Sequence, residues 1–75
     1  MASPETESNQ SVVINGRPRE IPAGLTVAAL LRHLSVDPER VAIELNREII
    51  RKPSWDSTKV DPGAELEIVQ FVGGG

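Results

Sequence analysis

The sequence predicts a single α+β domain in which one principal helix packs on one face of a mixed sheet of four to five strands. The chain has 75 residues, which is enough for one compact core and no more. One stretch carries helical periodicity, and short strand-like stretches lie on both sides of it in the sequence. Because one helix covers only one face of a sheet, the other face is expected to meet solvent.

The chain divides into three parts. Met1 to Gln10 is polar and acidic without apolar periodicity, and it predicts a disordered leader over residues 1–10. The domain itself is expected to span residues 11–72. Gly73 to Gly75 then forms a glycine tail, which is expected to be flexible because glycine leaves the backbone unrestricted.

A hairpin is expected at the start of the domain. Val12 to Ile14 reads as a short strand, and Asn15-Gly16 is a strong hairpin signal because both residues tolerate positive φ. The returning strand is expected from Arg17 to Ile21. Pro18 has no N–H to donate to a ladder, so this second strand is predicted at an edge of the sheet.

The helix is predicted near Val27 to Leu34. Thr26 is the expected N-cap, since its hydroxyl can accept a hydrogen bond from a free backbone N–H. Pro38 prevents the helix from continuing. The apolar stripe that faces the core repeats at helical spacing and consists of Val27, Leu30, Leu31 and Leu34.

Two short strands follow the helix. Val41 to Leu45 alternates apolar and other residues as a half-buried strand does, and Glu48 to Ile50 is a second short strand after a turn at Asn46-Arg47. Trp55 is expected to close one end of the core rather than to bind a ligand.

The final strand is expected from Glu65 to Val72. It places Leu66 and Ile68 on the face toward the helix, and it should lie parallel to the first strand at the centre of the sheet. The opposite face of this strand is acidic at its start and apolar at its end, where it carries Val69 and Phe71. Exposed apolar residues beside a flexible terminus indicate a docking surface, although packing under a loop is the alternative.

Composition excludes several classes of function. The chain has no cysteine, so disulfides, thiolate chemistry and cysteine-based metal sites are excluded, and His33 is its single histidine. The formal net charge of −3 argues against non-specific nucleic-acid binding. No apolar run has the length of a membrane span and no signal peptide is evident, so a soluble, cytoplasmic protein is expected.

Three stretches together resemble the ubiquitin-like β-grasp sulfur carriers, specifically the ThiS type of thiamine biosynthesis. They read VVINGRPREIPAGLTVAALL, VAIELNREIIRKPSW and DPGAELEIVQFVGGG. The resemblance covers nearly everything from Val12 to Gly75. No single piece is specific, but the pieces come in the order that this family has.

The resemblance implies that the chain is a carrier and not an enzyme. A ThiF-type adenylating enzyme would use ATP and Mg to adenylate the carboxylate of Gly75. Sulfur from a cysteine desulfurase or sulfurtransferase would then give a thiocarboxylate, which a ThiG-type thiazole synthase consumes. Gly74 and Gly75 match the terminal pair of this family. Gly73 and Gly74 are expected to give the tail access to the enzyme, Gly73 through its flexibility. No cofactor bound by the chain itself is implied.

The residues expected to dock the partner enzyme are Val69, Phe71 and Val72. Three other functions share some of these features. A ubiquitin-like protein modifier and the small subunit of molybdopterin synthase both use the same activation of a terminal Gly-Gly. A plain interaction domain with an inert tail is the third.

Overall fold

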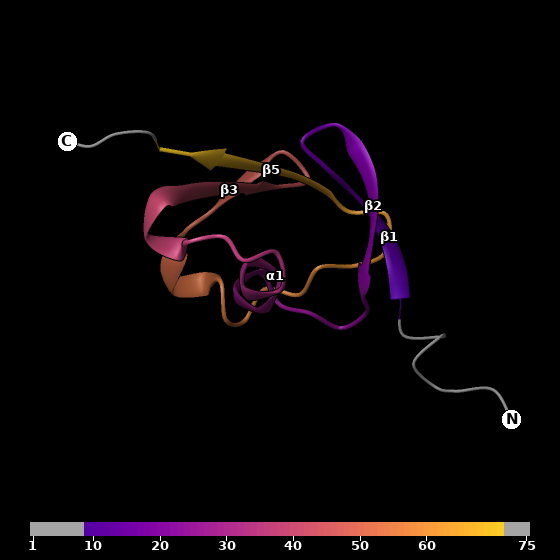
Figure 1. Ribbon diagram of the computed structural model, residues 1–75. Helices are drawn as coiled ribbons and strands as arrows, with labels where there is room; N and C mark the ends of the chain where they lie inside the picture. The colour runs from indigo at the N-terminus through magenta and orange to yellow at the C-terminus, as the bar shows by residue number, and fades with distance from the viewer. Residues whose placement is uncertain (1–8, 72–75) are drawn as a thin grey trace, which may run out of the picture.

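A computed structural model describes residues 9–71 of the chain. These residues fold into a five-stranded mixed sheet with one α-helix on one of its faces (Figure 1). The strands are β1 (Asn9–Ile14), β2 (Arg17–Pro22), β3 (Val41–Leu45), β4 (Glu48–Ile50) and β5 (Glu65–Gln70). The helix is α1 (Val27–His33), and two 3-10 turns are η2 (Pro38–Arg40) and η3 (Lys52–Ser54). The predicted α+β arrangement is therefore confirmed.

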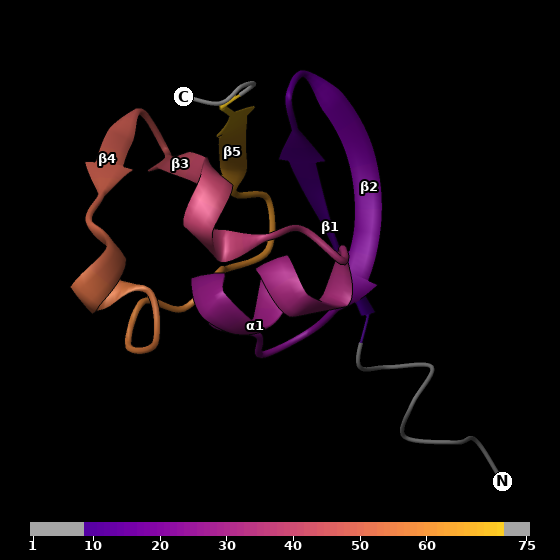
Figure 2. The ribbon, with the colours of Figure 1, turned by 60° about the vertical axis from the view of Figure 1, so that its left-hand side comes forward.

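β5 is the central strand of the sheet, whose order is β2-β1-β5-β3-β4. It runs parallel to β1 and antiparallel to β3, as expected of the first and last strands (Figure 2). β2 lies at one edge and pairs only with β1, so Pro18 occupies the edge position predicted for it. A missing N–H costs no ladder bond there.

β1 begins at Asn9, earlier than the predicted boundary between leader and domain. Asn9 pairs with Pro22 and Gln10 pairs with Ile21 across the β1–β2 ladder. The Gln10 side-chain amide also donates a hydrogen bond of 2.8 Å to the backbone carbonyl of Val60. Asn9 and Gln10 pair through backbone groups, which every residue carries. The pattern of apolar residues therefore could not predict that the strand begins at Asn9. Residues 1–8 of the expected leader lie outside the described residues.

The helix begins as predicted and ends one residue earlier. The Thr26 hydroxyl accepts a hydrogen bond of 3.2 Å from the N–H of Ala29, so Thr26 is the N-cap. At the other end, Ser35 adopts a φ of 59° and its N–H binds the carbonyl of Arg32. The N–H of Val36 binds the carbonyl of Leu31, which completes a Schellman motif. This motif ends the helix before Pro38 is reached.

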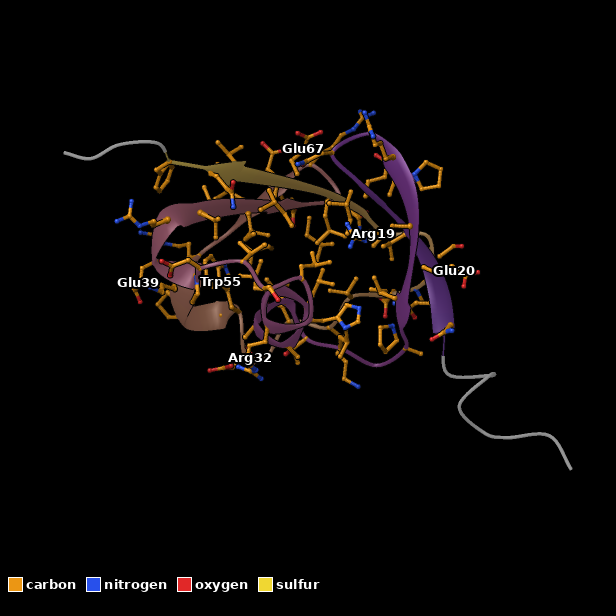
Figure 3. The ribbon with its side chains drawn as sticks, in the orientation of Figure 1. Arg19, Glu20, Arg32, Glu39, Trp55 and Glu67 are labelled. Carbon is orange, nitrogen blue, oxygen red and sulfur yellow. The ribbon has the colours of Figure 1, made fainter. Side chains whose placement is uncertain are left out.

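The core lies between α1 and the inner face of the sheet. Val27, Leu30 and Leu31 contribute from the helix, and Leu66 contributes from β5. Trp55 is buried at the α1 side, and its indole N–H donates a hydrogen bond of 2.8 Å to the carbonyl of Ile50 (Figure 3). The predicted packing role of Trp55 is therefore confirmed, because the only polar atom of its ring has a partner inside the fold.

Candidate functional site

The glycine tail is the chemical centre predicted from the sequence, and it lies beyond the described residues. The same is true of Val72, so the roles expected of Val72, Gly73, Gly74 and Gly75 stay predictions. What the structure describes is β5, the strand that leads into the tail, and the sheet face beside it. These determine where the tail starts and what a partner meets there.

One edge of β5 is held by an asparagine side chain. The ladder between β1 and β5 ends with the pair Ile14 and Leu66. Asn15 follows in the hairpin turn at a φ of 53°, which turns its side chain toward β5. Its Oδ1 accepts a bond of 2.7 Å from the N–H of Ile68, and its Nδ2 donates one of 3.2 Å to the Ile68 carbonyl. The Asn15 amide thus imitates one further backbone pair.

A second asparagine holds the beginning of β5 from the other hairpin. Asn46 has a φ of 51° in the turn between β3 and β4. Its Oδ1 accepts a hydrogen bond of 3.0 Å from the N–H of Glu65, and its own N–H donates one of 2.7 Å to the Glu65 carbonyl. Both hairpins therefore hold β5 through hydrogen bonds to its backbone.

The last described residues of the strand expose apolar side chains. Val69 is 54% exposed on the face of β5 away from the helix, and Phe71, the residue after the strand, is 56% exposed. The backbone N–H of Phe71 donates a hydrogen bond of 2.7 Å to the carbonyl of Arg40, which anchors the chain immediately before the tail. The predicted exposure of the two residues is confirmed, and the alternative of packing under a loop is wrong. Their role in docking stays a prediction.

The open face of the sheet carries a hollow of about 570 Å³. We call it the open-face hollow. Its charged lining comes from Glu44, Arg47, Glu65 and Glu67. The apolar residues that line it are Val13, Ala42, Ile43, Ile49, Leu66 and Val69. Glu67 lies on the side of β5 away from α1, as Figure 3 shows. The hollow therefore combines apolar and charged side chains on one sheet face, and Glu44 and Glu67 face each other on its two inner strands.

Ile49 is an exposed apolar residue of the open-face hollow that the sequence analysis did not predict. It is 74% exposed, more than either apolar residue on β5. A signal for it was present in the sequence. A two-residue turn at Asn46-Arg47 pairs Glu44 with Ile49, and cross-strand partners lie on the same face of a sheet. The outward position of Glu44 in the alternating strand therefore implies the outward position of Ile49.

Neither a cluster of metal-ligand residues nor a membrane-spanning helix is found among the described residues. Over residues 9–71, no three His, Asp or Glu side chains come together as metal ligands would. The single helix of that region is too short to cross a bilayer. His33 lies in the last turn of α1, where it is exposed.

Comparison with known proteins identifies relatives for most of the chain. The model of the ThiS family matches residues 12–75. The thiazole synthase of Paramagnetospirillum magneticum is 50% identical over 64 residues, which cover 85% of this chain but only 20% of the synthase. The chain therefore spans about one fifth of that relative. The uncharacterized protein ycf40 of Pyropia yezoensis is 37% identical over 68 residues, covering 91% of this chain and 96% of ycf40.

A solved structure has the same fold. The crystal structure of the thiamine biosynthesis protein ThiS from Geobacter metallireducens superposes with a TM-score of 0.78 at 35% sequence identity. The superposition covers 88% of this chain and all of the Geobacter chain. The five-stranded sheet with one helix is thus the β-grasp arrangement expected from the sequence.

Proposed function

The chain belongs to the ThiS family, and we propose that it is a sulfur carrier of thiamine biosynthesis whose Gly75 carboxylate becomes a thiocarboxylate. The observation that carries the proposal is the extent of the family match, which continues through the glycine tail to residue 75. The likeness therefore includes the reactive end as well as the fold. The Geobacter metallireducens relative, a thiamine biosynthesis protein over its full length, supports the same role.

The proposed reaction begins with adenylation by a ThiF-type enzyme. One carboxylate oxygen of Gly75 attacks the α-phosphorus of ATP, and pyrophosphate leaves with the electron pair of the broken P–O bond. Mg bound with ATP in that enzyme offsets the charge on the phosphates. The product is an acyl adenylate, which is electrophilic at carbon as the free carboxylate is not. This chain contributes the carboxylate, and the enzyme contributes every other group.

Sulfur then replaces the adenylate. The terminal sulfur of a protein persulfide, loaded by a cysteine desulfurase or sulfurtransferase, attacks the acyl carbon and AMP leaves. The resulting acyl disulfide is cleaved by a second cysteine thiolate of a partner, which forms a disulfide with the first cysteine and releases the thiocarboxylate. The carrier has no cysteine, so both cysteines belong to partners. The carrier is thus a co-substrate and not an enzyme.

A thiazole synthase is the proposed acceptor of the sulfur. Support comes from the thiazole synthase of Paramagnetospirillum magneticum, one fifth of which matches this chain at 50% identity. A carrier-like segment within the chain of a synthase keeps donor and acceptor at high local concentration. We propose that the present chain serves a ThiG-type synthase in the same way, in the cytoplasm where ATP is available.

The proposed docking contacts lie just before the tail. Val69 near the end of β5 and Phe71 just after it both expose apolar surface, and Val72 continues the sequence toward the glycines. We assign these three residues to contact with the activating enzyme, and Gly73 and Gly74 to passage of the tail into its active site. Small residues suit such a path because any Cβ narrows both the path and the backbone conformations available.

Intact-mass analysis tests the proposal. The protein ending at Gly75 is incubated with a purified ThiF-type enzyme, ATP, Mg and a persulfide donor, then analysed after removal of the donor. The expected product is heavier by the mass difference between sulfur and oxygen, and it disappears when ATP is omitted. An unchanged mass, with an enzyme that charges its own carrier in parallel, would refute the proposal. Isopeptide conjugates in place of the thiocarboxylate would indicate a protein modifier, and sulfur transfer to a molybdopterin precursor would indicate the molybdopterin synthase subunit.

A further inference from the structure

We propose that a second hollow, on the α1 side of the sheet, is a docking site for the protein that delivers sulfur to the carrier. The segment that binds there presents an apolar side chain with an aspartate or glutamate next to it. The proposal rests on the proposed function, because that function requires a persulfide-bearing protein as the sulfur donor. It goes further by giving this donor a place on the carrier and a surface chemistry.

The second hollow has an apolar floor, and we call it the α1-side hollow. Its volume is about 290 Å³. The apolar residues that line it come from β1, from β5 and from the end of the helix, and they are Ile14, Leu34, Val36 and Ile68. Ile14 belongs to the buried core, and the other three are partly buried and pack against it. An incoming apolar side chain therefore meets apolar surface that the core already holds in place.

Arg19 alone is charged among the described residues that line the α1-side hollow. It pairs with the buried Val12 across the β1–β2 ladder, and cross-strand partners lie on the same face of a sheet. Figure 3 shows Arg19 reaching from β2 toward the α1 side of β5. Neither ion pair found within residues 9–71 involves Arg19. A guanidinium beside apolar surface suits a carboxylate, which can accept two parallel hydrogen bonds from it.

The two hollows lie on opposite faces of β5 and differ in the sign of their charge. Ile68 lines the α1-side hollow and Val69 lines the open-face hollow, because successive residues of a strand point to opposite faces. Three carboxylates and one guanidinium line the open-face hollow, whereas the α1-side hollow has one guanidinium. Surfaces of opposite sign select different partners, since like charges brought together are costly. The partner on the α1 side is therefore acidic.

The proposed reaction requires two proteins on the carrier at the same time. The acyl adenylate reacts with water outside a closed active site, so sulfur must arrive while the activating enzyme is still bound. Val69 and Phe71 are assigned to that enzyme, which leaves the α1 side of β5 for the donor. Gln70, the last residue of β5, lines the α1-side hollow. The five residues from there to Gly75 span at most about 17 Å, so the donor's persulfide must lie within about that distance of the segment that binds.

Single-turnover sulfur transfer tests the proposal in the full chain. The carrier is adenylated on excess purified ThiF-type enzyme with ATP and Mg, and a sulfurtransferase loaded with persulfide is added over a range of concentrations. Thiocarboxylate, followed by intact mass, gives the donor concentration at half the maximal rate. The measurement is repeated at low and high salt, and with inorganic sulfide, a donor that needs no docking. Melting temperature, ATP–pyrophosphate exchange and native mass are measured on the same samples.

Two variants change the charge of the α1-side hollow. Arg19→Gln removes the guanidinium, and Gln70→Glu adds a carboxylate where the acidic donor binds. Each should raise the half-saturating donor concentration about tenfold at low salt and less at high salt, and Arg19→Lys should recover part of the loss. Exchange, reaction with sulfide and melting temperature should stay at wild-type values, because both side chains are exposed. Arg17→Gln is the matched control that should leave donor saturation unchanged, since Arg17 is exposed on the same strand and lies outside the lining.

Several outcomes overturn the proposal, and they separate it from the proposed function. Wild-type donor saturation in both hollow variants, while the wild type forms thiocarboxylate, refutes the docking site and leaves the carrier function intact. An equal loss in Arg17→Gln assigns the effect to overall charge, and a matching fall in melting temperature assigns it to folding. Weaker exchange or slower reaction with sulfide assigns the hollow to the activating enzyme, and a dimer that Arg19→Gln abolishes assigns it to a second copy of the chain. Failure of the wild type itself to be adenylated refutes the carrier function and the docking site together.

Discussion

The side chain of Asn15 forms two hydrogen bonds with the backbone of Ile68, a residue 53 positions later in the chain. A turn residue thereby supplies the pairing that β1 no longer provides after Ile14. The contact joins the first hairpin to the strand that leads into the tail. Both bonds are exposed, so each contributes the modest free energy of a bond that competes with water.

We expect Asn15→Gly to lower the free energy of unfolding by about 1–2 kcal/mol, because two hydrogen bonds are lost while the turn keeps its positive φ. Asn15→Ala should cost about 1 kcal/mol more, since alanine is disfavoured in that backbone conformation. Asn15→Asp retains the acceptor for the Ile68 N–H and should fall between wild type and Asn15→Gly. Urea denaturation measures all three, and a glycine variant as stable as wild type would show that the side-chain bonds are unimportant.

The two hairpin turns of the sheet can be compared with each other, because they have similar backbone conformations and different residues. Both place two successive residues at positive φ, Asn15-Gly16 in one and Asn46-Arg47 in the other. Arg47 has a φ of 71°, where glycine is strongly preferred. We expect Arg47→Gly to raise the free energy of unfolding by up to about 1 kcal/mol as this strain is relieved.

Gly16→Ala is the matched opposite of that change. Gly16 has a φ of 82°, and an added Cβ would meet no atom within 4 Å. A loss of stability in this variant therefore reports backbone strain and not a clash, and we expect about 1 kcal/mol. Thermal and urea unfolding measure both variants. Destabilisation by Arg47→Gly would mean that the arginine side chain makes a contact worth more than the strain.

Phe71→Ala is expected to weaken adenylation without weakening the fold. Phe71 is 56% exposed, and its anchoring bond to Arg40 uses the backbone N–H, which alanine keeps. The Michaelis constant for the carrier in ATP–pyrophosphate exchange should rise about tenfold if Phe71 is a principal contact. A sharp fall in melting temperature, with normal activation of the protein that remains folded, would instead make Phe71 a structural residue.

The tail prediction concerns Gly75 and Gly74. Deleting Gly75 moves the carboxylate back by about 3.5 Å along an extended chain. Thiocarboxylate formation should be lost, because a displacement of about 1 Å already costs roughly a hundredfold in rate. Gly74→Val should also reduce it strongly, since a β-branched side chain restricts the backbone next to the reacting group.

Melting temperature is the control for both tail variants. Along β5, Leu66 is buried in the core and Ile68 packs against it, well before the tail, so we expect both variants to melt as the wild type does. Thiocarboxylate is measured on each by intact mass. A full yield from the protein lacking Gly75 would contradict the assignment of the chemistry to that residue.

The local elements of this protein could be predicted from its sequence because each depends on residues that are neighbours in the chain. Thr26 caps the helix through a bond to a residue three positions later, so the cap does not depend on tertiary packing. The alternation from Val41 to Leu45 reflects a strand with one buried face and one open face. Pro18 keeps its strand at the edge of the sheet, because proline has no backbone N–H to donate to a second neighbouring strand. The parallel pairing of the first and last strands followed from the order of elements around one helix.

Tertiary structure decided which residues meet across the sheet. The register between β3 and β5 places Glu44 opposite Glu67, and these residues are far apart in sequence. That register is set by the packing of Ile43, Leu45 and Leu66 in the core, because a slip of one residue would turn all of them to solvent. The outward face has no such constraint, so its carboxylates, its exposed Ile49 and its hollow follow from the way the inner face packs.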